Sequence, residues 1–102
     1  FNVLELKACD DILFEHNKNV NLSAALVENV YINENDMGYI TLSAGSNNVV
    51  IENNIIHNSD WGIMITSEDK GPLRMLKPSN NVIIGNKITH SGQYSIWLNE
   101  TQ

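Results

Sequence analysis

The stretch "SNNVVIENNIIHN", from Ser46 to Asn58, decides the fold. A second stretch, "SNNVIIGNKITHS", from Ser79 to Ser91, repeats it further along the chain. In both stretches β-branched and other apolar residues alternate with polar ones, which is the period-2 pattern of a β-strand. Asparagine recurs among them outside any obvious turn, which indicates short strands separated by tight bends.

The repeat extends well beyond these two stretches. Superposing Ser46–Ser67 on Ser79–Glu100 needs no gap. Weaker copies lie upstream, so that successive units begin at positions 11, 29, 48 and 81. Coils of roughly twenty residues with several short strands are typical of a β-solenoid. The sequence therefore predicts an all-β fold, with residues 1–102 forming one solenoid of about four to five coils and an inserted loop at 67–79.

The sixteen asparagines have a structural explanation in such a fold. Each coil turns corners between strands, and asparagine tolerates the positive φ that a tight bend requires. Stacked coils also place asparagine over asparagine, so that side-chain amides can form a hydrogen-bonded ladder. Asn53 and Asn86 are the best candidates for this ladder, and Asn17 and Asn35 are weaker ones.

The alternation also predicts which side chains fill the interior. In the two clear copies, Val50 and Ile83 should point outward. The expected interior comprises eighteen side chains: Ile12, Phe14, Val20, Leu22, Val30, Ile32, Ile40, Leu42, Val49, Ile51, Ile55, Ile63, Ile65, Val82, Ile84, Ile88, Ile96 and Leu98.

The segments "NNVVIENNIIHNSDWGIMI" and "NNVIIGNKITHSGQYSIWL" resemble the right-handed parallel β-helix family, the pectin-lyase-like superfamily. Its signature is N-V-x-I-x-N-N-x-I, a short turn, then G-I-x-I, and the resemblance covers most of Asp11 to Glu100. The chain opens with Phe1 in a strand-like stretch, and neither end shows an amphipathic capping helix. We therefore expect a segment of a longer solenoid whose partners include the adjoining coils of the parent chain.

Composition excludes several kinds of partner. The net charge is −6 and the isoelectric point is near 4.8, which argues against binding to nucleic acid or to an anionic membrane. No apolar run is long enough to span a bilayer. Cys9 is the single cysteine, so the chain cannot form an internal disulfide.

Function is predicted only through the resemblance. It implies a secreted, periplasmic or cell-surface protein that binds a polysaccharide or oligosaccharide along the β-helix face, as part of a polysaccharide lyase or a glycoside hydrolase. The alternative is a non-catalytic β-helix scaffold of an adhesin, a phage tail or a surface protein. A third hypothesis, a periplasmic metal-handling β-helix, rests on Met37, Met64, Met75 and the histidines.

The inserted loop 67–79 supplies the first candidate binding residues. It carries Lys70, Arg74 and Lys77, half of the basic residues of an acidic chain. Loops that project from a rigid solenoid commonly carry binding groups. We expect Lys70 and Arg74 to bind acidic sugars over a saccharide groove, and the alternative is a solvated surface loop.

The remaining substrate-binding candidates lie beside the repeat: His57, Asp60, Trp61 and His90. His57 and His90 share a repeat position, which favours stacked surface histidines over a metal site, since a metal needs a third ligand. No motif identifies a catalytic residue, and no metal site is predicted from the histidines. Lyases of the resembling family pair a Ca²⁺-binding acidic cluster with a basic residue, so Ca²⁺ would enter only with a lyase. The acidic candidates are Glu34, Asp36, Asp60, Glu68 and Asp69. Those that could form such a cluster are Asp36, Asp60 and Asp69, with Lys70 or Arg74 as the basic residue.

Overall fold

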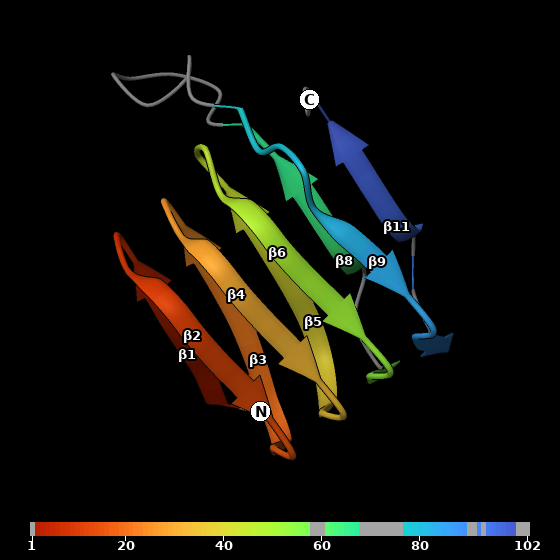
Figure 1. Cartoon of the computed structure of the whole chain (residues 1–102). Coiled ribbons are helices and arrows are strands. Elements are labelled where there is room, and N and C mark those ends of the chain that lie inside the picture. The colour runs from red at the N-terminus through yellow and green to blue at the C-terminus, as the bar shows by residue number, and fades with distance from the viewer. Residues whose placement is uncertain (1, 58–60, 68–76, 90–91, 93, 100–102) are drawn as a thin grey trace.

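The computed structural model describes residues 2–57, 61–67, 77–89, 92 and 94–99. These residues form parallel strands joined by bends (Figure 1). The strands are β1 (Asn2–Lys7), β2 (Asp10–Glu15), β3 (Lys18–Ala25), β4 (Glu28–Asn33), β5 (Asp36–Ser43), β6 (Asn47–Glu52), β7 (Ile55–His57), β8 (Trp61–Thr66), β9 (Val82–Ile84), β10 (Lys87–Thr89) and β11 (Tyr94–Asn99). Within this part of the chain no helix is long and apolar enough to cross a membrane.

The strands form two sheets, which Figure 1 shows as a front and a back layer. A four-stranded sheet has the order β2-β4-β6-β9, and a seven-stranded sheet runs β1-β3-β5-β7-β10, with β8 paired to β5 and β11 paired to β8. Because the first six strands alternate between the sheets, the chain coils, and the predicted all-β solenoid is confirmed. It makes about three turns rather than four to five, since three steps lead from β2 to β9.

The core lies between the two sheets and follows the predicted alternation in the early coils. Leu22, Ile40 and Ile63 stack in register and are fully buried, as are Ile32 and Ile51 in the opposite sheet. Each such side chain contributes about 1.5–3 kcal/mol when it leaves water. Val27, Met37 and Ile56 are also buried, although the pattern did not predict them.

Five residues of the predicted interior are exposed: Ile55, Val82, Ile84, Ile96 and Leu98. Ile96 and Leu98 keep the predicted phase, because they pair with the buried Ile63 and Ile65, but β11 is an edge strand of the described sheet. In β9 the cause is register, because Val82 pairs with Val50 rather than with Val49, and Ile83 pairs with the buried Ile51. The pairing of β6 with β9 is thus displaced by one position from the repeat alignment, and such a slip exchanges the two faces of a strand. Ile83, predicted to point outward, packs against the core.

Residues with left-handed backbone form columns along the corners. One column has φ values of 54–59° at Asp11, Asn29, Asn48 and Asn80, where each strand of the four-stranded sheet begins. A second column follows the same strands and contains His16, Glu34, Asn53 and Gly85. Asparagine thus occupies bends as predicted, and the stacked coils hold His16 and Glu34 in the same backbone conformation.

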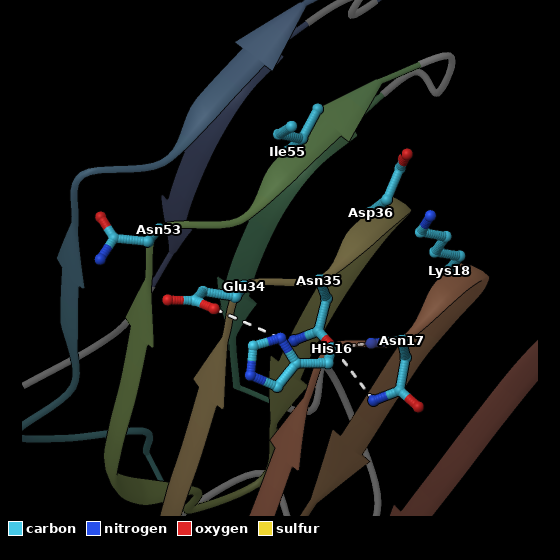
Figure 2. Close-up of a pocket in the computed structure, with 8 residues that line it drawn as sticks. All are labelled: His16, Asn17, Lys18, Glu34, Asn35, Asp36, Asn53 and Ile55. Atoms are coloured by element: carbon cyan, nitrogen blue, oxygen red, sulfur yellow. Dashed lines mark hydrogen bonds and ion pairs between the residues drawn. The ribbon is translucent and has the colours of Figure 1, made fainter.

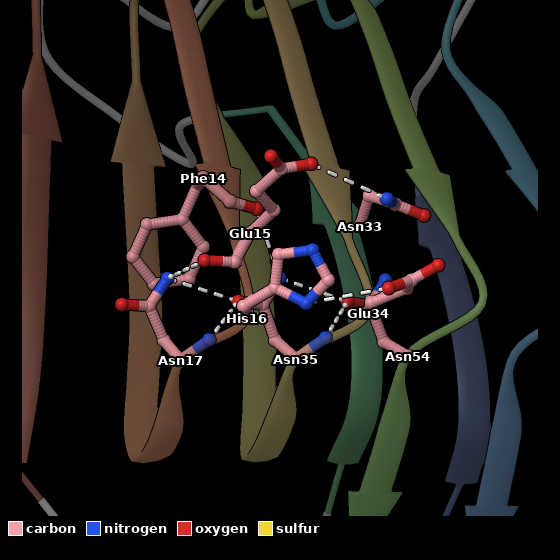
Figure 3. Close-up of polar contacts among 8 residues, drawn as sticks. All are labelled: Phe14, Glu15, His16, Asn17, Asn33, Glu34, Asn35 and Asn54. Carbon is pink, nitrogen blue, oxygen red and sulfur yellow. Dashed lines mark hydrogen bonds and ion pairs between the residues drawn. The ribbon is translucent and has the colours of Figure 1, made fainter.

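The asparagine ladder runs inside the second corner and includes Asn17, Asn35, Asn54 and Asn86. Figure 3 shows the first three of them. The Oδ1 atom of Asn54 accepts hydrogen bonds of 2.9 Å from both the backbone and the side-chain nitrogen of Asn35. Asn86 accepts the same pair from Asn54. The prediction is confirmed for Asn86 and wrong for Asn53, which is exposed at the bend while its neighbour Asn54 points inward.

Gly85 is the last residue of the second column, and a side chain would not fit at its position. Its φ is +67°, and a Cβ atom there would lie 2.5 Å from Oδ1 of Asn53 on the neighbouring coil. We expect Gly85→Ala to lower the free energy of unfolding by about 1–2 kcal/mol, because left-handed alanine is strained. Denaturant unfolding measures this loss. As a control, Gly85→Ala is also made in a chain that carries Asn53→Gly, which removes the clashing side chain. A loss of the same size in that chain would assign the whole effect to the backbone.

Candidate functional site

A groove of about 440 Å³ lies outside the corner that contains the ladder, where β2, β4 and β6 end and β3, β5 and β7 begin. Its lining comes from three successive coils (Figure 2). The residues are His16, Asn17, Lys18, Glu34, Asn35, Asp36, Asn53 and Ile55.

A simple local pattern positions these side chains. Each ladder asparagine is flanked by two residues, in the triplets H-N-K at 16–18, E-N-D at 34–36, N-N-I at 53–55 and G-N-K at 85–87. Because the asparagine points into the solenoid, the side chains on either side of it point outward. Parallel pairing then stacks Lys18, Asp36 and Ile55 in one row.

Two contacts between histidine and carboxylate join neighbouring coils in this region. Nδ1 of His16 lies 3.3 Å from Oε2 of Glu34, and both side chains are more than half exposed. Nε2 of His57 lies 2.7 Å from Oδ1 of Asp36, and this pair is less exposed. Lys18 is exposed, and no carboxylate among the described residues lies within ion-pair distance of it.

The groove offers hydrogen-bonding groups of both signs beside an apolar surface. Glu34 and Asp36 can accept hydrogen bonds, Lys18 can donate them, and the half-exposed Ile55 supplies a hydrophobic contact. The part of the chain that is described holds no group of three His, Cys, Asp or Glu side chains placed to bind a metal ion. The groove is thus suited to hold a polar molecule with an apolar face.

The structure places few of the predicted site residues. Asp60, Lys70, Arg74 and His90 lie outside the described residues, as does Asp69 of the Ca²⁺ hypothesis. Trp61 begins β8 and pairs through its backbone with Tyr94. His57 ends β7, where it contacts Asp36 and pairs through its backbone with Thr89.

The sequence analysis missed His16 and Lys18 as site residues and considered Glu34 and Asp36 only as acidic candidates. The signal that could have found all four is the triplet around each ladder asparagine. Aligning the chain on Asn53 concealed it, because the ladder position is Asn54.

Comparison with known proteins agrees with the architecture. A family model described as "Right handed beta helix region" matches residues 14–102, which is most of the chain. Neither the curated proteins nor the solved structures include a significant match. The parallel sheets, the coil period and this match show that the chain belongs to the right-handed β-helix family.

Proposed function

We propose that the protein binds carbohydrate along the outside of its β-helix, as part of a secreted polysaccharide lyase or glycoside hydrolase. The observation that carries this proposal is the corner groove, in which hydrogen-bonding side chains and the half-exposed Ile55 line the same cavity. Sugars offer hydroxyl groups to polar side chains and C–H faces to apolar ones, and ligand sites combine these two kinds of contact. Membership of a β-helix family adds support by analogy of fold.

Acidic sugars fit the groove through Lys18. Its ammonium group has no carboxylate partner among the described residues, so it is available for the carboxylate of a uronic acid. Glu34 and Asp36, which lie on the next coil, would accept hydrogen bonds from hydroxyl groups of the sugar. Neighbouring strands lie about 4.8 Å apart, so successive coils would place their contacts at this regular spacing along an extended oligomer.

Calorimetric titration with pectin, alginate and neutral xylan oligomers tests this proposal. We expect Lys18→Gln to weaken binding of the two acidic oligomers about three- to tenfold, and added salt to weaken it further. The matched control is Lys7→Gln, which removes the same charge from an exposed position in β1. Equal weakening by the two substitutions would show that only net charge matters and would contradict a site at the groove.

A separate substitution in the same titration tests the segment 67–79, which the sequence predicts to be an inserted loop. If Lys70 and Arg74 also contact acidic sugars, Arg74→Ala will weaken binding of pectin or alginate. Binding of neutral xylan alone would favour a glycoside hydrolase over a lyase.

A non-catalytic scaffold is the second candidate, and one observation favours it. The His16–Glu34 and His57–Asp36 contacts each join adjacent coils, so the charged side chains of the groove also stabilise stacking. A chain that binds none of the three oligomers would favour this function.

A further inference from the structure

The outer face of the four-stranded sheet combines apolar side chains with carboxylates. A row of apolar side chains crosses its strands in register, one from each coil: Leu13, Tyr31, Val50 and Val82. Leu13 is 62% exposed and Val82 is 47% exposed. Figure 1 shows β2, β4, β6 and β9 side by side, with no other described segment lying across them.

Carboxylates flank this apolar row on both sides. The four strands carry five of them and no lysine or arginine: Asp10, Asp11, Glu15, Glu28 and Glu52. Asp10, Asp11 and Glu28 lie near the beginnings of their strands, whereas Glu15 and Glu52 lie at the ends. The described lysines of the opposite sheet, in contrast, include Lys7, Lys18 and Lys87.

Neutral donors on neighbouring coils hold three of these carboxylates in place. Nδ2 of Asn29 donates to Asp11 at 3.2 Å, and Nδ2 of Asn33 donates to Glu15 at 3.4 Å (Figure 3). The hydroxyl of Tyr31 donates to Glu52, and this bond raises the pKa of Tyr31. No lysine or arginine among the described residues pairs with any of the five carboxylates. Their negative charge is therefore uncompensated on this face.

The dimensions of the face match those of a short α-helix. The apolar row crosses four strands about 4.8 Å apart and therefore extends for about 14 Å. Residues two apart in a strand are separated by about 6.6 Å, so carboxylates lie about 7 Å or more to each side of the row. An α-helix of about ten residues is about 15 Å long, and with side chains it is about 10–12 Å wide.

We propose that this face binds a basic amphipathic helix of a partner protein, aligned with the solenoid axis. The apolar stripe of that helix covers Leu13, Tyr31 and Val50, and lysine or arginine on its two flanks pairs with the carboxylates. Charge complementarity carries the choice of partner, because an apolar partner without cations would leave the carboxylates next to a dry interface at high cost.

The test uses the whole chain and a synthetic helical peptide of about fourteen residues, with leucine on one face and lysine on both flanks. Fluorescence anisotropy measures its dissociation constant. We expect Leu13→Ser combined with Glu28→Gln to weaken binding about tenfold or more. The matched control combines Val3→Ser with Glu5→Gln, which makes similar chemical changes at exposed positions of β1 and should alter binding less than about twofold.

Three outcomes would overturn the proposal. Equal weakening by the test and control variants would mean that the peptide responds only to net charge. Equal binding of a shuffled peptide, with the same composition and no apolar stripe, would show that the apolar row is not used. Self-association that Leu13→Ser abolishes would assign the face to a second copy of the chain.

Glu28→Lys should weaken binding more than Glu28→Gln, and circular dichroism checks that the variant is folded.

Discussion

Asn54→Ala should lower the free energy of unfolding by about 3–5 kcal/mol, because the substitution leaves several buried polar groups without partners. Asn54 is 1% exposed, and its Oδ1 atom accepts both hydrogen bonds from Asn35. Its Nδ2 atom donates to the carbonyl oxygen of Ile32 at 3.1 Å and to Asn86 at 2.9 Å. Urea unfolding followed by far-ultraviolet circular dichroism measures the loss.

Asn53→Ala is the matched control, since it makes the same chemical change one residue earlier. Asn53 is exposed, with φ 55°, so the expected loss is about 1–2 kcal/mol from left-handed alanine alone. Losses of equal size at both positions would contradict the assignment of the ladder to Asn54.

Ile56→Ala should cost about 2–5 kcal/mol of unfolding free energy, whereas Ile55→Ala should cost about 1 kcal/mol or less. Ile56 is fully buried between the sheets, and Ile55 is 48% exposed beside the groove. The two substitutions remove the same atoms, so the difference measures which of them faces the core. Guanidinium unfolding, with the denaturant slope checked for each variant, gives both values.

The reverse order, with Ile55→Ala more damaging, would restore the register that the repeat predicted. Equal and small losses at both positions would instead mean that β7 contributes little to the stability of the solenoid.

Strand composition and coil period were sufficient to predict the fold. Alternation of β-branched residues identified the inward rows of the early coils, because a strand with one buried face fixes its own phase. Asparagine in bends followed from its tolerance of positive φ. Ala8 and Leu26 also adopt positive φ, and no local preference predicts that. Stacking on neighbouring coils imposes this conformation, so it is a tertiary property.

The phase between the last two coils could not be read from identity of residues. Matching Asn53 with Asn86 aligns the largest number of identical residues. The structure, however, pairs β6 with β9 and β7 with β10 one position away from that alignment. The pairing returns to the alignment only between β8 and β11, where Trp61 meets Tyr94. Nothing in the sequence marks where the extra residue enters, so the ladder and the groove triplets were displaced by one position.

The sequence predicted the type of side chain at the candidate site but not its position. Polar side chains on the outside of a solenoid were expected, but the groove depends on which residues flank the ladder asparagine, and that follows from the register. Glu34 and Asp36 were recognised as candidates because they are acidic. Their contacts with His16 and His57 join residues on different coils, far apart in the chain, and only the stacking of coils reveals them.

The ladder also gives the molecule a direction of growth. Each asparagine offers its backbone and side-chain N–H groups to the oxygen of the asparagine one coil later. A finished coil therefore presents to the next coil the same pair of donors that the preceding coil presented to it. Genetic duplication of one coil-length unit would reproduce this surface and leave existing contacts intact. Whole coils are thus the natural increments by which such a protein changes length in evolution.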